Sequence, residues 1–201
     1  MAFEDKLENW LEFHGIEPDN LPRIDLYMDQ ITTFMEEQLG ETKRFEEDKI
    51  FTKTMINNYS KNQLLPPSVK KKYSRNHLIL LTYIYYLKNF LSISDIQKVL
   101  APLKDGFYDD DGEMSFYEIY EYIYQFENHR NNVMKDSVMD SYNEIKTLFD
   151  QVENKADREK LQKFSYILLL GYDIYLKKHI IESMIDEYFP EVEDKKKKKK
   201  K

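Results

Sequence analysis

The stretch Thr52-Lys-Thr-Met-Ile-Asn-Asn-Tyr-Ser-Lys-Asn-Gln-Leu-Leu-Pro-Pro67 decides the fold of the first half of this chain. Thr52 is a good N-cap, and apolar residues follow it at helical spacing, so the stretch predicts a short amphipathic helix. Proline cannot continue a helix, so Pro66-Pro67 forbids its extension far past Leu65. The face opposite Met55, Ile56 and Tyr59 is polar and free of acids. It carries Lys53, Thr54, Asn57, Asn58 and Lys61.

Three adjacent lysines follow the two prolines. Residues 66–73 cannot begin as a helix and therefore predict a protruding loop or a small β-wing. A helix and a wing of this kind suit DNA recognition, because Asn pairs with adenine edges while Lys and Arg neutralise phosphates or reach guanine. The wing would contact the DNA backbone. Its candidate contacts are Lys70, Lys71, Lys72, Tyr73 and Arg75.

The helix and the wing lie in a segment that lacks acids. Residues 49–94 carry eight Lys or Arg and no Asp or Glu, although the 201-residue chain has a formal net charge of −7. Residues 1–48 have 4 basic and 14 acidic groups, and residues 95–194 have 11 and 23. A polyanion partner would select against carboxylates on one surface. The alternatives are a core segment poor in charge, which eight bases do not fit, and a small helical domain with solvated lysines.

Apolar residues recur at spacings of three and four along most of the chain, which predicts helices and no long strands. Ser74 and Ser92 are caps for two helices after the wing, the second closed by Pro102 and Gly106. The other predicted helices cover 4–14, 24–39, 116–152 with a possible break near Asn131, and 157–188. The centre of the last helix is apolar nearly all round, so we expect it to be buried by other helices or by a second chain. A homodimer would supply the second chain.

The order of these motifs resembles the DNA-binding head of the MerR family. In that family a second helix ends in a Tyr-Tyr-(Glu)-(Arg)-x-Gly-Leu-Leu-Pro pattern, and a wing closing with Arg-x-Tyr-Ser follows. The residues that match are Asn58-Tyr59, Lys61, Leu64-Leu65-Pro66 and Tyr73-Ser74. Asn57 stands where the family has a DNA-contacting Arg, and Gln63 replaces its Gly.

Longer motifs resemble a second family more closely. DLYMDQITTFMEE, TKTMINNYSKNQLLPP, KKYS and LKNFLSISDI are similar to YkrK-like bacterial proteins, a family described as domain of unknown function 1836. This resemblance covers about residues 20–105 and implies a MerR-like fold. The helix at 24–39 would then be the first helix of the helix-turn-helix, joined to the recognition helix by a long connector.

Several classes of function find no support in the sequence. Position one of an EF-hand reading around Asp109, Asp111, Gly112 and Glu118 would be Phe107, which argues against calcium. The chain has no Cys, and its four His residues have no metal-ligand spacing. No nucleophile, phosphate-cradling or zinc-protease pattern is present. We therefore expect no enzyme, metal or cofactor, and His77 reads as a packing or phosphate-contacting residue.

The sequence predicts an all-α protein with a MerR-like winged helix-turn-helix domain followed by a C-terminal helical domain. The expected function is transcription regulation by a homodimer bound to double-stranded DNA, with the C-terminal helices joining subunits or sensing a signal. The alternative is a protein-interaction module that binds an acidic protein partner. With no signal peptide or membrane span in view, we expect a cytoplasmic protein. The expected regions are an N-terminal extension (1–19), the winged domain (20–105), the C-terminal domain (106–190) and a disordered Lys-rich tail (191–201).

Overall fold

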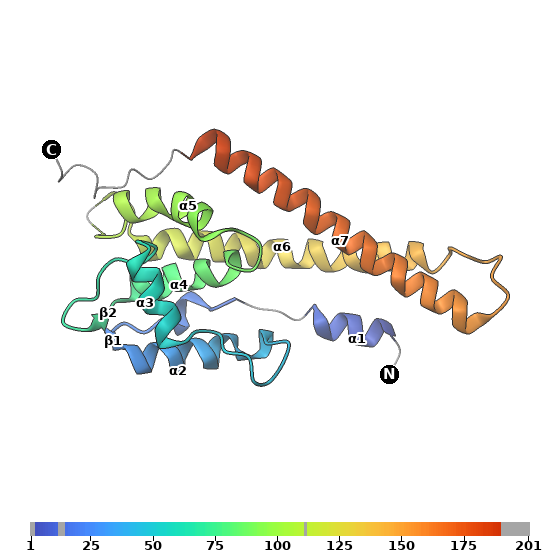
Figure 1. Ribbon diagram of the computed structural model, residues 1–201, viewed down its shortest axis with the longest axis horizontal. Coiled ribbons are helices and arrows are strands. Elements are labelled where there is room, and N and C mark those ends of the chain that lie inside the picture. The colour runs from blue at the N-terminus through green and yellow to red at the C-terminus, as the bar shows by residue number, and fades with distance from the viewer. Residues whose placement is uncertain (1–2, 12–14, 111, 190–201) are drawn as a thin grey trace. The chain divides into compact units, whose positions relative to one another are not determined.

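The computed structural model describes residues 3–11, 15–110 and 112–189 (Figure 1). These ranges are mostly helical, which confirms the all-α class. The predicted Lys-rich tail and Asp111 lie outside the described residues. The helices are α1 (Phe3–Trp10), α2 (Met28–Leu39), α3 (Lys53–Lys61), α4 (Arg75–Leu87), α5 (Ile93–Gly106), α6 (Phe116–Ile145) and α7 (Lys155–Tyr188). Two short strands, β1 (Leu26–Tyr27) and β2 (Lys72–Tyr73), and 3-10 turns at Pro18–Asn20 and Gly40–Thr42 complete the described elements.

Helix boundaries agree only in part with the spacing-based prediction. The helix predicted from residue 24 begins at Met28, because Leu26–Tyr27 pairs with β2. Helix α5 ends at Gly106, as the sequence predicts, but Pro102 lies inside it. Helix α6 has no break near Asn131 and ends at Ile145.

The chain divides into two compact units. In described residues, the head unit comprises 15–110, 112–124 and 182–189, and the hairpin unit comprises 3–11 and 125–181. The sequence-based boundary near residue 105 falls inside the head unit. The reason is that the start of α6 belongs to this core, since Phe116 and Tyr120 are buried and the Tyr120 hydroxyl donates to the Ile16 carbonyl at 2.5 Å.

Helix α4 forms the centre of the head unit. Its residues from Asn76 to Thr82 are all buried, as is Ile84. An apolar face on α2 (Ile31, Met35 and Leu39) and one on α3 (Ile56 and Tyr59) are also buried in this unit. Burial of such faces is the main source of helical stability in a folded protein.

A connector of residues 40–52 joins α2 to α3. It is tied to α2 through Glu36, whose carboxylate accepts a hydrogen bond from the Lys43 ammonium at 2.6 Å and one from the Ile50 N–H at 3.3 Å. The bond from Lys43 is the main cause that lowers the pKa of Glu36. The connector therefore has a defined path despite its length and charge.

The hairpin unit consists of α1 packed on the remainder of α6 and most of α7. Its core contains Leu7, Tyr142, Ile145 and Tyr166. The Tyr166 hydroxyl donates to the Val138 carbonyl at 2.7 Å, which joins α7 to α6. None of the helices in the described part of the chain is both long and apolar enough to cross a membrane.

Candidate nucleic-acid interface

The candidate recognition helix α3 is held at its start by its own sequence. The Thr52 hydroxyl accepts a hydrogen bond from the Met55 N–H at 3.2 Å. This N-cap satisfies one of the backbone donors that the first turn leaves unpaired. Ile56 and Tyr59 are buried, so the rotation of the helix about its own axis is fixed.

The opposite face of α3 is exposed, as the spacing predicts. Its two bases and two amides are groups that contact phosphates and purine edges. Helix α3 itself carries no acid. The structure thus brings five predicted site residues together on one helix face. They are Lys53, Thr54, Asn57, Asn58 and Lys61.

A carboxylate from another element nevertheless reaches this face. Asp29, in the first turn of α2, forms an ion pair with Lys53, and both side chains are exposed. The segment 49–94 contains no acid, but the surface that it forms is therefore not free of acids. Exposed ion pairs contribute only about 0–1 kcal/mol, so a phosphate could compete with Asp29 for Lys53.

Lys88, one of the eight bases of this segment, has a structural position instead. Its ammonium donates to the Ile50 carbonyl at 2.9 Å and lies 4.7 Å and 4.8 Å from the ring centroids of Phe51 and Tyr85. Burial lowers the pKa of Lys88. Because this ammonium is bonded to the connector, at most seven of the eight bases can bind a partner.

Helix α3 ends at a residue with left-handed backbone conformation. Gln63 has a φ of 59°. The Leu64 N–H donates to the Tyr59 carbonyl at 2.9 Å, and the Gln63 N–H donates to the Ser60 carbonyl at 3.2 Å. These two bonds form a Schellman motif, in which glycine usually occupies the position of Gln63. The backbone is therefore the one that glycine would favour, although the side chain is glutamine.

The predicted wing between α3 and α4 is a small β-hairpin of the head unit, called the hairpin below and distinct from the helical hairpin unit. Its tip consists of two lysines. Val69 and Lys72 exchange backbone hydrogen bonds at 3.0 Å and 2.9 Å, so Lys70 and Lys71 form a two-residue turn. Their φ values are 51° and 64°, a pair for which Asn-Gly is the preferred sequence. A left-handed conformation costs about 1–2 kcal/mol per L-residue. This backbone strain lies where both lysine side chains are exposed.

The second arm of the hairpin pairs with the segment before α2. Strands β1 and β2 are antiparallel, with Leu26 opposite Tyr73 and Tyr27 opposite Lys72. The Lys72 ammonium lies 5.2 Å from the centroid of the Tyr27 ring. The hairpin is thereby anchored to the start of α2.

Two of the predicted wing residues lie away from the tip. Tyr73 is buried with 6% exposure, so its side chain is part of the core. Arg75 is partly exposed, and its guanidinium stacks on Tyr117 with the carbon 4.3 Å from the ring centroid. Lys70 and Lys71 are therefore the wing residues that are most accessible to a partner.

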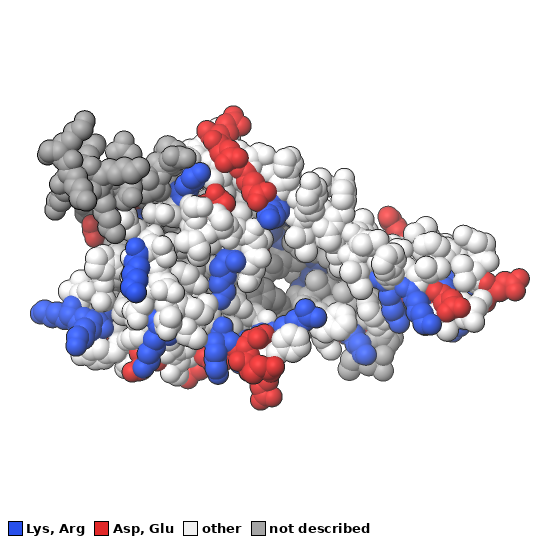
Figure 2. All heavy atoms as spheres, in the orientation of Figure 1, with Lys and Arg blue, Asp and Glu red and all other residues white. Residues whose placement is uncertain are grey.

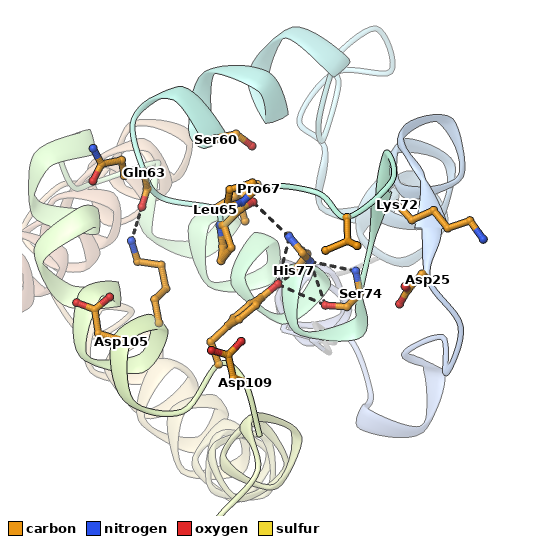
Figure 3. Close-up of a pocket in the computed structure, with 14 residues that line it drawn as sticks. Asp25, Ser60, Gln63, Leu65, Pro67, Lys72, Ser74, His77, Asp105 and Asp109 are labelled. Atoms are coloured by element: carbon orange, nitrogen blue, oxygen red, sulfur yellow. Dashed lines mark hydrogen bonds between the residues drawn. The ribbon is translucent and has the colours of Figure 1, made fainter. Parts of the chain in front are cut away.

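His77 joins the two ends of the wing (Figure 3). Its Nδ1 accepts a hydrogen bond from the Ser74 N–H at 3.0 Å, so this nitrogen carries no proton. The other nitrogen, Nε2, lies 3.3 Å from the Pro66 carbonyl and must be the donor. The Tyr108 hydroxyl lies 2.6 Å from Nδ1. Neutral His77 thus ties the start of the wing to its end and to the loop after α5.

Burial favours the neutral form of both rings of this cluster. It lowers the pKa of His77, and it raises the pKa of Tyr108 to about 12. His77 is 3% exposed, so it is a packing residue and not a phosphate contact. Sequence reasoning gives no role to Tyr108, because nothing in the spacing of 31 residues links it to His77.

A pocket of about 530 Å³ lies beside His77, between the end of α3, the base of the hairpin and the end of α5. Three of its lining residues are acids: Asp25, Asp105 and Asp109. The Lys104 ammonium donates to the Gln63 carbonyl, and the Lys72 side chain points away from His77 (Figure 3). The base of the hairpin is therefore more acidic than its tip.

The acidic turn after α5 has a structural role. The Asp110 carboxylate accepts a hydrogen bond from the Asn76 amide at 3.0 Å and one from the Phe116 N–H at 2.6 Å. It thereby joins α4 to the start of α6, where negative charge is favourable. Among the described residues, no group of three or more His, Asp or Glu could hold a metal ion.

Figure 2 shows how the charges of the head unit are arranged on one face. Lys and Arg side chains protrude at the end where Figure 1 shows the hairpin, and others are spaced over the area of α3. Acidic side chains on this face gather mainly away from the hairpin tip. Exposed positive charge is thus found on the hairpin and on α3, an arrangement that is chemically suited to a polyanion.

Comparison with family models matches residues 16–123, which is more than half of the chain. The matched range nearly coincides with the part of the head unit between residues 15 and 124. No curated protein and no solved structure matches the chain. The surface of α3 and the hairpin described above thus lies within the matched segment, and the chain belongs to the family described as Domain of unknown function (DUF1836).

Proposed function

We propose that this protein is a DNA-binding transcription regulator that acts as a homodimer, each head unit reading one half-site. Helix α3 would lie in the major groove, and the lysines at the hairpin tip would contact the backbone of the same double-stranded DNA. One observation carries the proposal. The exposed faces of a short capped helix and of a strained basic turn belong to one compact unit, and both are rich in groups that bind phosphates and bases.

The order of elements in the head unit supports a MerR-like winged helix-turn-helix within this proposal. A short strand precedes α2, α3 follows a connector, and a hairpin that pairs with the strand leads into α4. Gln63 has the backbone conformation expected of the glycine it replaces in the MerR pattern. The connector of residues 40–52 is the feature that departs from a simple turn.

The first experiment is retention of genomic DNA fragments from the source organism by the purified full chain at about 50 mM salt, where phosphate contacts are strong. Selection of the bound fragments would also identify the operator. Absence of retention under these conditions would contradict the proposal.

A single-lysine variant tests which surface contacts the DNA. Lys71→Gln should weaken binding and reduce the slope of log K against log salt by about 0.9, the value for one lost phosphate contact. Lys160→Gln is the matched control, because Lys160 lies on α7 and bonds to Asp157 at 3.3 Å. It should leave the slope unchanged.

The alternative function is an interaction module that uses the same basic face on an acidic protein. Its chemical basis is that exposed bases bind carboxylates as well as phosphates, as Lys53 does with Asp29 within this chain. The DNA-retention experiment distinguishes the two functions. A module of this kind would show no selection among genomic fragments.

A further inference from the structure

The hairpin unit contains a pocket of about 530 Å³ where α1 meets the end of α6 and the start of α7. The rings of Phe3 and Tyr142, with centroids 4.7 Å apart, form an aromatic wall. Tyr142 is buried, and its ring packs edge-on against Tyr166 with centroids 5.3 Å apart. Pockets of roughly 300–1,000 Å³ take small molecules, so this volume suits a metabolite.

Basic side chains surround the aromatic wall. Arg158 lies 3.9 Å from the Asp150 carboxylate, and Lys155 lies 4.0 Å from that of Glu159, both near the upper limit for an ion pair. The lining therefore contains more bases than acids, and its two acids are Asp150 and Glu159. The four lining bases are Lys146, Lys155, Arg158 and Lys163.

Positive charge also lies directly against the rings. The Lys163 ammonium is 5.9 Å from the centroid of Phe3, and the Lys146 ammonium is 5.2 Å from that of Tyr142. Gln162 donates through its amide nitrogen to the carbonyls of Lys146 and Leu148, just after α6, and its amide oxygen is an acceptor. The pocket thus combines an aromatic wall, a cationic rim and an amide.

We propose that this pocket binds a small anion that carries a flat aromatic ring, of the nucleoside phosphate class. The ring would stack on Phe3, whose own ring packs on the buried Tyr142. Arg158 and Lys163 would bind the phosphate oxygens through charge-assisted hydrogen bonds, for which the guanidinium fork is well shaped. The site belongs to the hairpin unit alone, so the inference goes beyond DNA binding by the head unit and does not depend on it.

Trp10 provides a direct readout. It is the single tryptophan of the chain, and its ring lies edge-on to Phe3 with centroids 5.9 Å apart. The full chain is titrated with ADP, with adenosine and with inorganic phosphate, by Trp10 fluorescence and by calorimetry. ADP should bind saturably. Adenosine and phosphate should each bind at least about tenfold more weakly, because each offers only half of the recognised chemistry.

Variants on α7 test the cationic rim. Lys163→Gln and Arg158→Gln each remove a charge-assisted hydrogen bond and should weaken ADP binding about tenfold. Lys160→Gln is the matched control, since Lys160 is a similarly exposed lysine of the same helix outside the pocket. It should leave the affinity unchanged. Circular dichroism of each variant verifies that the helices are intact.

Three results would overturn the proposal. The first is the absence of saturable ADP binding up to about millimolar concentration, the weak limit for a specific site. The second is equal loss of affinity in Lys160→Gln and Lys163→Gln, which would assign the effect to general charge. The third is equal affinity for ADP and for either fragment, which would remove the role of the rings or that of the bases.

Discussion

At the scale of single residues, Gln63 is held in a conformation that glycine adopts without steric cost. Gln63→Gly should raise the free energy of unfolding by about 0.5–1 kcal/mol, because relief of the left-handed strain outweighs the added flexibility of the unfolded chain. Urea unfolding measures the change. Gln63→Ala keeps the strain and is the control, so an equal gain in both variants would show that the backbone conformation is not the cause.

Lys70 and Lys71 carry the same kind of strain at the hairpin tip. The double variant Lys70→Asn, Lys71→Gly installs the preferred turn sequence and removes two positive charges. It should stabilise the fold by about 1 kcal/mol and reduce the salt slope of DNA binding by about 1.8. Opposite movement of stability and affinity is the diagnostic result. Loss of both would show that the turn needs lysine for folding.

His77 makes the stability of the head unit depend on pH. Burial lowers the pKa of His77 in the folded chain. Below the unfolded-state pKa of about 6.5, the unfolded chain therefore binds a proton at His77 more readily than the folded chain does. The free energy of unfolding should therefore be fully retained above about pH 6.5 and fall as the pH drops toward the folded-state pKa, by up to 1.4 kcal/mol per pH unit. Urea unfolding from about pH 8 to about pH 5 measures this slope.

The control for this prediction is His77→Gln, which has no titrating ring. Its absolute stability should be lower, because the bonds to Ser74 and Pro66 are disturbed. The informative quantity is the pH slope, which should be shallower than that of the unmodified chain. An identical slope in both chains would assign the pH dependence to other groups.

At the scale of the element, α7 presents two faces. Tyr166, Leu169 and Leu170 pack in the hairpin core. The other face is apolar and exposed, with Phe164 at 58%, Leu168 at 57% and Tyr175 at 64% exposure, and Gly171 lies between Leu168 and Tyr175. Their spacing of three and four residues makes one stripe. Among the described residues of the hairpin unit, no element covers this stripe, and we expect a second copy of the chain to cover it.

Charge on the stripe should therefore disrupt dimers. Leu168→Glu combined with Tyr175→Glu should convert the protein to a monomer in sedimentation experiments. In a dimer, the new carboxylates would be buried against those of the second copy without a partner of opposite charge. Ile180→Glu is the matched control. Ile180 is 57% exposed and lies nine residues, about two and a half turns, after Gly171, on the other side of the helix. Unaltered sedimentation of the stripe variant would remove this face as the dimer interface.

Local patterns predict the helices well, but they do not predict what depends on distant partners. The N-cap Thr52 and the apolar residues of α3 lie close together in sequence, and the structure confirms both the cap and the buried face. Strand β1 has only two residues, too few for a visible alternation, and it exists because β2 pairs with it. The acid-free segment indicates the basic face. It cannot show that Asp29 forms an ion pair with Lys53 or that Lys88 donates a hydrogen bond to the Ile50 carbonyl. These contacts are set by tertiary packing.

At the scale of the whole molecule, the net charge of −7 and the basic face act together. A mostly acidic chain should repel DNA over much of its surface, so we expect its described part to contact DNA through α3 and the β-hairpin that follows it. At most seven bases of residues 49–94 can contact phosphates, so their share of the slope of log K against log salt should be no steeper than roughly −6 per subunit. A titration over salt concentration measures it.

The position of each base then decides its effect on this slope. Lys71→Gln should reduce the slope by about 0.9, whereas Lys177→Gln, on the exposed surface of α7, should leave it unchanged. Both substitutions change the net charge from −7 to −8. The comparison therefore separates local contact from total charge. Equal slopes in the two variants would mean that DNA responds to the charge of the whole molecule, and the confinement of binding to one face would be wrong.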